Sequence, residues 1–313
     1  MRIRLGNGIE IEGERRILLD PISTEEESIT LISHAHSDHV PKDIRNPKGS
    51  VFSSKATAEI LSSFYGADKV NAMEFNSQYD FNGIKVTPLV AGHILGSTMY
   101  LIEHDGPRIL YTGDINVEGG LTVEGPADLQ EADILIIEAT YGSPEYLFPD
   151  QDRVRMDLVK WAVNSVRDGL IPMISAYTIG KSQEIIYLLN RLTNLPVVVS
   201  RGVARANKAY LNYFDLIYEL DHDEPYVYVS SRWRDVERSV KAVATGWAIR
   251  KDFGGVKGFC LSSHSDFKGL LRTVMKVDPE IVLTVYGQSR RFAEELRNMG
   301  IKAEALSNNF IKL

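Results

Sequence analysis

The sequence predicts an α/β protein made of two connected parts, and three observations lead to this expectation. The chain has 313 residues, more than one typical domain and enough for two. Short apolar segments separated by turn residues dominate the first 143 residues, and several end in a histidine or an aspartate. From about residue 144 the pattern becomes an alternation of strands and helices, which predicts a mostly parallel sheet.

In the first part, short apolar runs bounded by turn residues predict strands. Ser54 precedes an apolar run with helical spacing, so residues 55–65 are expected to form a helix. The expected strands are Arg2–Leu5, Ile9–Glu12, Ile17–Asp20, Ile29–Ile32, 84–90, 98–103, 107–112 and 134–137.

In the later part, helical periodicity alternates with short β-branched runs. We expect helices at Met156–Arg167, Lys181–Leu192, Ala204–Phe214, from 267 and at Ser289–Met299. The expected strands are Met173–Ala176, Pro196–Val199, Val227–Val229, Val240–Thr245, a segment from Phe259 to Ser263, and 281–286.

Composition indicates an ordinary soluble globular protein, with 44% hydrophobic and 25% charged residues. The single cysteine, Cys260, excludes an internal disulfide and is expected to pack inside the strand from Phe259 to Ser263. The N-terminus has no apolar signal region, and no stretch approaches the ~18 apolar residues that a membrane span requires. We therefore expect a cytoplasmic protein with no membrane partner.

The net charge of −7 is distributed unevenly. Residues 1–150 carry 11 Lys or Arg and 24 Asp or Glu, whereas residues 151–313 carry 24 and 18. The basic half is compatible either with solvated faces or with a surface that contacts a nucleic-acid backbone. Trp233 and Trp247 lie among its basic clusters and could stack on bases or pack internally. These clusters contain Arg201, Arg205, Lys208, Arg232, Arg234, Arg238, Arg250 and Lys251.

The stretch His34-Ala-His36-Ser-Asp38-His39 holds three of the seven histidines and follows the apolar run Ile29–Ile32. Strand alternation would place His34 and His36 on one side, and a turn could bring Asp38 and His39 back toward them. Neutral imidazoles with a carboxylate suit zinc, and two ligand groups this close suit two zinc ions. The alternative is a polar loop that is rich in histidine by chance.

Two further ligand candidates follow apolar segments downstream. His93 lies in Ala91-Gly-His93, and Asp114 lies in Thr112-Gly-Asp114, so each stands next to a glycine at the end of an expected strand. Either motif alone is weak, because a Thr-Gly-Asp sequence is commonly a turn with a solvated aspartate. Together with the histidine cluster they predict one metal centre.

Two single polar residues also end apolar segments. Glu138 follows Ile134–Ile137, and His264 follows the segment that begins at Phe259. A solvated strand end is the alternative for the glutamate, and a helix-terminal or core histidine is the alternative for His264.

The segment from Ser175 to Lys181 reads as a strand, a glycine turn and a helix start. Such a turn exposes backbone N–H groups at a helix N-terminus, which favours anion binding. Tyr177, Gly180 and Lys181 are therefore candidate substrate-binding residues.

Together these motifs resemble the metallo-β-lactamase superfamily, and Glu138 with His264 resembles the extra motifs of its β-CASP nucleases. The resemblance implies an αββα sandwich interrupted by an α/β β-CASP domain. The sandwich would span residues 1–143 and 256–313, and the insertion residues 144–255. It also implies that one metal is held by His34, His36, His93 and Asp114, and a second by Asp38, His39 and Asp114.

The Tyr177-x-x-Gly180-Lys181 element is similar to that of DNA crosslink-repair nucleases related to Artemis and Apollo, and of ligase-associated DNA exonucleases. Thr245-Gly-Trp247 also matches the latter group. Most RNA-cleaving members carry a Val-His-Gly motif, where this chain has Val285-Tyr286-Gly. The crosslink-repair nucleases also lack this histidine, which favours DNA, whereas the ligase-associated group usually keeps it, so the motif points both ways. Because a phenol is a poor zinc ligand, we expect a weaker second metal site.

The resemblance implies a zinc-dependent nuclease with one or two zinc ions, or manganese in their place. DNA is favoured as substrate, with a 5′-end-directed exonuclease in repair or processing as the leading interpretation. An RNA-processing endo- or exoribonuclease of the mRNA 3′-end type is the alternative. A small-molecule hydrolase and a noncatalytic nucleic-acid-binding scaffold are less favoured. Asp38 would orient the attacking water, and His264, oriented by Glu138, would protonate the leaving group.

Overall fold

A computed structural model describes residues 2–13, 15–104, 106–223 and 225–312, and in it the chain divides into two compact units. Unit 1 contains Met1–Gly119, Val123–Tyr146 and His264–Leu313, and unit 2 contains Gly120–Thr122 and Leu147–Ser263. The domain limits expected from the sequence differ in the assignment of residues 120–122, 144–146 and 256–263.

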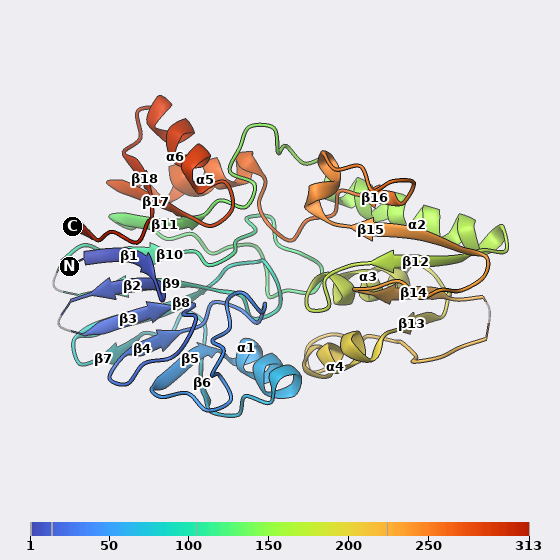
Figure 1. The fold of residues 1–313 in the computed structure, drawn as a ribbon, viewed down its shortest axis with the longest axis horizontal. Helices are drawn as coiled ribbons and strands as arrows, with labels where there is room; N and C mark the ends of the chain where they lie inside the picture. Colours follow the sequence, from blue (N-terminus) through green and yellow to red (C-terminus); the bar gives the residue numbers. More distant parts are fainter. Residues whose placement is uncertain (1, 14, 105, 224, 313) are drawn as a thin grey trace. The chain divides into compact units, whose positions relative to one another are not determined.

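Unit 1 contains two seven-stranded sheets (Figure 1). The first has the order β19-β1-β2-β3-β4-β5-β6, with strands at Arg2–Gly6 (β1), Gly8–Glu12 (β2), Arg16–Leu19 (β3), Ile29–Leu31 (β4), Ser50–Ser54 (β5), Val70–Met73 (β6) and Ile311–Lys312 (β19). The second has the order β18-β17-β11-β10-β9-β8-β7, with strands at Tyr79–Phe81 (β7), Ile84–Val90 (β8), Thr98–Glu103 (β9), Ile109–Tyr111 (β10), Ile134–Glu138 (β11), Ile281–Val285 (β17) and Ala303–Ala305 (β18).

The side chains of β11 show why these sheets pack in layers. Ile134 and Ile136 belong to the core shared with the first sheet, whereas Leu135 and Ile137 belong to a second core on the other face. This alternation follows from the two-residue period of a strand. A central strand buried on both faces therefore appears in the sequence as a continuous apolar run.

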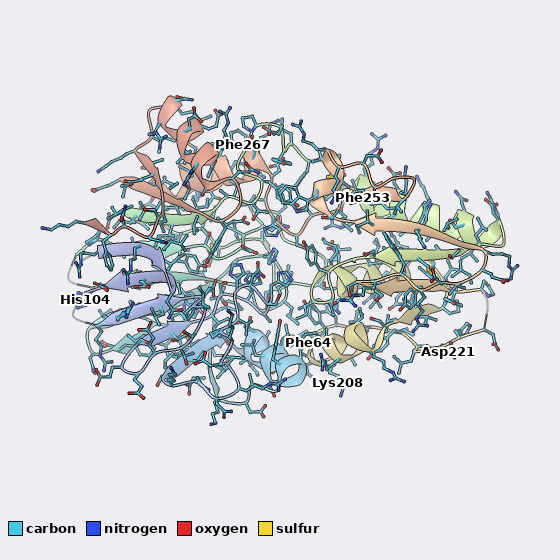
Figure 2. All side chains as sticks on the ribbon, in the orientation of Figure 1. Phe64, His104, Lys208, Asp221, Phe253 and Phe267 are labelled. Carbon is cyan, nitrogen blue, oxygen red and sulfur yellow. The ribbon has the colours of Figure 1, made fainter. Side chains whose placement is uncertain are left out.

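Helices cover the outer faces of unit 1. Helix α5 (Phe267–Val277) and helix α6 (Ser289–Asn298) pack on the second sheet, where Phe267, labelled in Figure 2, lies 6.0 Å from Phe292 between ring centroids. Helix α1 (Lys55–Ile60), continued by a π-helical turn (η1, Leu61–Tyr65), packs against β5 and β6. The layers are helix, sheet, sheet and helix, which confirms the predicted fold class.

Unit 2 is built on a five-stranded sheet in which every pairing is parallel, as the strand–helix alternation predicted. The strand order is β13-β14-β12-β15-β16, so the chain passes from β12 to the edge strand β13, returns to β14 between them, and then continues to β15 and β16 on the other side of β12. The strands are Ile171–Ser175 (β12), Val197–Val199 (β13), Val227–Ser230 (β14), Ser239–Ala244 (β15) and Lys257–Phe259 (β16). The helices are Gln151–Arg167 (α2), Lys181–Leu192 (α3), Arg201–Tyr210 (α4) and a 3₁₀ turn (η2, Gly246–Ile249).

Several expected boundaries were wrong. Helix α2 begins at Gln151 rather than Met156, because the Asp150 side chain caps it by accepting from Arg153 N. Helix α4 begins at Arg201 rather than Ala204, because Ser200 caps it in the same way. The strand expected from Phe259 to Ser263 ends at Phe259, since Leu261 N donates back to the Phe259 carbonyl and turns the chain.

Cys260 consequently lies outside a strand and is only partly buried. Within the part of the chain that the structure describes, no helix is both long enough and apolar enough to span a bilayer.

Candidate metal centre

The predicted ligand residues lie in loops at one edge of the unit 1 sheets. His34 and His36 follow β4, His93 follows β8, Asp114 follows β10 and Glu138 ends β11. Strand β9 is antiparallel to both β8 and β10, and β10 is parallel to β11, so the C-terminal ends of β8, β10 and β11 meet at the same edge. Local sequence places each residue at a strand end, and sheet pairing brings these ends together.

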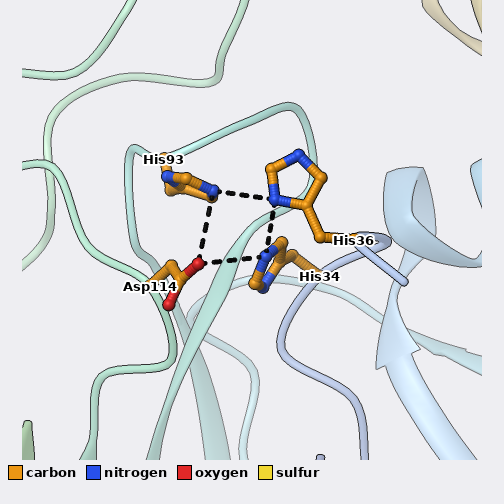
Figure 3. Close-up of side chains that lie close together, drawn as sticks. All are labelled: His34, His36, His93 and Asp114. Carbon is orange, nitrogen blue, oxygen red and sulfur yellow. Dashed lines mark hydrogen bonds and ion pairs between the residues drawn. The ribbon is translucent and has the colours of Figure 1, made fainter. Parts of the chain in front are cut away.

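Four of these residues form a compact cluster. His34, His36, His93 and Asp114 each present a donor atom, and these atoms lie within 4.8 Å of one another. His36 Nδ1 is 3.1 Å from His34 Nε2 and 3.2 Å from His93 Nε2, and Figure 3 shows the four side chains around one point. Three imidazoles and one carboxylate converging in a largely buried position fit a zinc ion in number and type.

The two carboxylate oxygens of Asp114 face different groups. Oδ2 is 3.4 Å from His34 Nε2 and 3.6 Å from His93 Nε2, whereas Oδ1 is 3.5 Å from His39 Nε2. Each oxygen of Asp114 therefore faces one of the two predicted ligand groups. Burial would raise the pKa of Asp114, but the charges of His39 and His264 and a hydrogen bond from His34 outweigh it and hold that pKa well below its usual range.

Protonation differs between the two histidines that flank this carboxylate. Burial and the charge of His264 hold the pKa of His93 well below its usual value, which keeps its ring neutral, as a metal ligand must be. Burial also opposes the charge on His39, but Asp114 and Asp20 outweigh it and raise the pKa of His39 to about 10. The raised pKa favours a protonated His39, whose ring lies between the carboxylates of Asp20 and Asp114.

Of the predicted second ligand group, His39 lies between the other two, since its Nε2 faces both Asp114 and Asp38. His39 Nε2 is 3.8 Å from Asp38 Oδ2, and the Asp38 side chain is 80% exposed. The buried histidine is thus fixed, while the aspartate at the rim has access to solvent.

Asp20 is a functional candidate that the sequence analysis missed. It follows β3, has a positive φ of 47°, and its buried carboxylate accepts from Ser33 N, Ser33 Oγ and the Tyr111 hydroxyl. Its Oδ2 also lies 2.7 Å from His39 Nδ1, so it fixes the orientation of that ring. The signal was available, because Leu18-Leu19-Asp20 is another apolar run that ends in a carboxylate.

Tyr286 lies next to this network. Its hydroxyl is 3.3 Å from that of Tyr111, which donates to Asp20, and its ring centroid is 5.2 Å from that of His39. Burial, followed by the charge of Asp20, raises the pKa of Tyr286 far above the neutral range, so the phenol stays protonated. Tyr286 thus contacts both His39 and Tyr111, which donates to the carboxylate that orients His39.

Glu138 and His264 form the pair that the sequence suggested. His264 Nδ1 is 2.8 Å from Glu138 Oε1, and the buried carboxylate also accepts from Ile115 N and Thr140 N. His264 Nε2 points toward Asp114, 3.9 Å from its Oδ2. Burial opposes its charge, but Glu138 and then Asp114 outweigh it and raise the pKa of His264 to about 9.

The three residues expected to bind substrate lie in unit 2, and two of them are buried. Lys181 Nζ is 2.6 Å from Glu184 Oε2, and Arg155 binds the other oxygen of the same carboxylate at 2.8 Å. The Gly180 N–H donates to the Gln183 side chain. Both donors therefore already have protein partners. Their role in phosphate binding stays a prediction.

Comparison with known proteins extends these observations. The Beta-lactamase superfamily domain matches residues 8–168. The chain is 30% identical over 303 residues to "Probable DNA ligase" of Opitutus terrae, covering 90% of this chain and 29% of that protein. It is 28% identical to "RNase J-like protein" of Methanocaldococcus jannaschii (66% of this chain, 58% of that protein) and 26% identical to "Endoribonuclease ysh1" of Schizosaccharomyces pombe (90% and 42%).

The chain therefore spans less than two thirds of each of these relatives. A crystal structure of a protein of unknown function from Enterococcus faecalis V583 has the same fold. It superposes with a TM-score of 0.70 at 13% identity, covering 100% of this chain and 99% of that one.

Proposed function

Because the chain belongs to the metallo-β-lactamase superfamily, we propose that it is a metal-dependent nuclease that hydrolyses phosphodiester bonds in nucleic acid. The resemblance to the β-CASP nuclease branch drawn from the sequence motifs is confirmed by the relatives. The single observation that carries the proposal is the Glu138–His264 pair beside Asp114. A small-molecule hydrolase would need the metal cluster but would leave this second pair unexplained.

One metal would be held by His34, His36, His93 and Asp114, and a second by Asp38, His39 and Asp114. Zinc or manganese bound there supplies an activated water at neutral pH and offsets negative charge on the phosphate. Asp20 holds the His39 ring in the orientation that directs Nε2 toward Asp114.

His264 is placed to donate a proton to the leaving oxygen. Its Nδ1 is engaged by Glu138, so Nε2 is the atom available for transfer, and its raised pKa keeps it protonated at neutral pH. A well-placed general acid contributes about 10²- to 10⁴-fold to a rate. Asp38, which reaches the rim of the cluster, is suited to orient the attacking water.

We propose DNA as the preferred substrate and attack from a 5′ end, as part of repair or processing in the cytoplasm. The match of 90% of the chain to a protein named "Probable DNA ligase" supports DNA. Tyr286 in place of the Val-His-Gly histidine is a mixed signal, because the crosslink-repair nucleases also lack that histidine whereas the ligase-associated group usually keeps it. The matches to proteins named as endoribonucleases favour RNA processing, which stays the second candidate.

The test uses zinc- or manganese-loaded protein with DNA and RNA oligonucleotides of identical sequence, each carrying a 5′-phosphate or a 5′-hydroxyl. Product ladders from end-labelled strands should show stepwise shortening of DNA from the 5′ end. Cleavage of RNA alone would replace the first candidate by the second. Absence of cleavage in both, with the metals bound, would contradict a nuclease.

A further inference from the structure

Unit 2 contains a pocket outside the proposed metal centre, at the carboxyl edge of its parallel sheet. Its volume is about 300 Å³, and its walls come from the residues that follow three neighbouring strands. Ser175 to Tyr177 continue β12, Ser231 follows β14, and Val243 to Thr245 end β15. Ser175 Oγ donates to the Ser231 carbonyl, which ties two of these walls together.

This position on the sheet favours ligand binding. In open parallel sheets ligands bind outside the carboxyl ends of the strands, where the strand order changes direction. Here β13 and β14 lie on one side of β12, and β15 and β16 lie on the other. The pocket lies at the ends of β12 and β15, which is the position that the strand order favours for a ligand.

Aromatic side chains form much of the lining. Tyr177 is 61% exposed, Trp247 is the second residue of the 3₁₀ turn after β15, and Phe253, labelled in Figure 2, lies in the loop before β16. Trp247 N donates to Thr245 Oγ1, which fixes the turn that carries the indole. Flat aromatic walls bind planar rings by stacking, and they do so for any base because every base has a π-face.

The charge of the lining selects an anion. Lys251 is the cation of the pocket, its Nζ lies 5.4 Å from the centre of the Phe253 ring, and among the described residues that line the pocket none is acidic. Hydroxyl groups of Ser175, Ser231 and Thr245 add hydrogen-bonding capacity. A planar ring that carries a phosphate matches this combination of aromatic walls, hydroxyls and one ammonium.

We propose that this pocket binds one nucleotide, with its base stacked against Trp247 and Tyr177 and its phosphate beside Lys251. A volume of about 300 Å³ is at the small end of ligand sites, which fits a single base and excludes a duplex. For a nucleotide at the end of a strand the inference rests on the proposed nuclease function. Binding of a free mononucleotide does not depend on it.

The first experiment is equilibrium dialysis of the full chain with a radiolabelled nucleoside 5′-monophosphate. Loss of the indole in Trp247→Ala should weaken binding about 10-fold, and Trp247→Phe should restore it to within about 2-fold because it keeps a stacking ring. Unchanged binding in Trp247→Ala, or equal competition by ribose 5-phosphate, which has no base, would overturn the proposal.

Lys257 provides a matched control for Lys251. Both lysines are exposed and both lie near a phenylalanine ring, Lys257 at 5.9 Å from that of Phe259, but only Lys251 lines the pocket. Lys251→Ala should weaken mononucleotide binding about 5-fold, and Lys257→Ala should leave it unchanged. Equal effects of the two substitutions would mean that the surface charge, and not the pocket, attracts the nucleotide.

A second arm compares the free mononucleotide with single-stranded oligonucleotides and records hydrolysis in the same preparation. Lys251→Ala should lower the salt dependence of oligonucleotide binding by about one phosphate contact. Binding that depends on Trp247 without any cleavage by the parent protein would keep the pocket and reject the nuclease. Cleavage with equal oligonucleotide binding by the parent and Trp247→Ala would reject the pocket and keep the nuclease.

Discussion

Two buried polar clusters of this protein differ in how their charges are balanced. In unit 2, Glu184 lies between Lys181 and Arg155, and each cation reaches its own carboxylate oxygen. In unit 1, three imidazoles face one another at 3.1 and 3.2 Å around a single Asp114 carboxylate. The first cluster is complete within the protein, whereas the second gathers electron-pair donors that a cation would satisfy. The arrangement of the side chains thus distinguishes the charge-balanced cluster around Glu184 from the candidate metal ligands around Asp114.

The largest expected effect breaks the unit 1 cluster. His36→Ala removes the imidazole that lies within 3.2 Å of both His34 and His93, so we expect loss of tight zinc binding and of hydrolysis, with thermal unfolding of the apoprotein unchanged. Metal analysis of the purified variant checks this prediction. Unchanged zinc stoichiometry would remove His36 from the site.

The corresponding substitution in unit 2 should affect stability. Glu184→Gln leaves the buried Lys181 and Arg155 charges facing a neutral amide, at a cost of about 3–5 kcal/mol in the free energy of unfolding. Urea denaturation would measure it, with the exposed Glu304→Gln as control. A loss below about 1 kcal/mol would mean that water replaces the missing charge.

Acid should act on the same carboxylate. Burial would raise its pKa, but Lys181 and Arg155 outweigh burial and keep the pKa of Glu184 below its usual value. The folded state therefore binds the Glu184 proton less readily than the unfolded state, whose pKa is about 4.3. The stabilisation from this group is present above that pH and is lost as pH falls below it. The slope of the free energy of unfolding against pH in this acid range should therefore be smaller in Glu184→Gln than in the parent protein.

His264→Ala should show whether His264 acts as a general acid or as a metal ligand. Because its Nδ1 is bound to Glu138 and it is not one of the four residues of the three-imidazole cluster, zinc content should stay the same while kcat falls at least about 10²-fold. Parallel loss of zinc and activity would show that His264 is itself a metal ligand.

A smaller effect should follow from Glu138→Gln. Glu138 is the largest influence that raises the pKa of His264, and His264 is protonated below about pH 9. Removing the Glu138 charge lowers the pKa of His264, so the acid loses its proton at lower pH. The alkaline limb of the profile of kcat against pH therefore moves to lower pH. Profiles of the variant and parent that coincide on the alkaline side would exclude His264 as the titrating acid.

The smallest effect is expected at the second metal group. Tyr286→His would place an imidazole near His39, so zinc occupancy of the weaker position should rise from between one and two ions per chain toward two. The substitution also removes the hydroxyl beside Tyr111. Two slowly exchanging metals in the unmodified protein would contradict a weak second site.

The structure brings four of the predicted ligands together, His34, His36, His93 and Asp114, because each follows an apolar strand. The sequence analysis missed Asp20, although that residue also ends an apolar strand. It has no histidine close to it in the sequence, and only the fold brings it to His39. The pairing of Lys181 with Glu184 was not predicted, although the two residues have i,i+3 spacing on a helix. The contribution of Arg155 was not visible in the sequence, because tertiary packing brings it to Glu184 across 29 residues of chain.

The most direct test of the central claim is a crystal structure of the zinc-loaded protein with anomalous diffraction recorded at the zinc edge. We expect a strong peak between His34, His36, His93 and Asp114, and a second, weaker peak between Asp114, His39 and Asp38. Absence of a peak at the first position in protein that binds zinc would contradict the account.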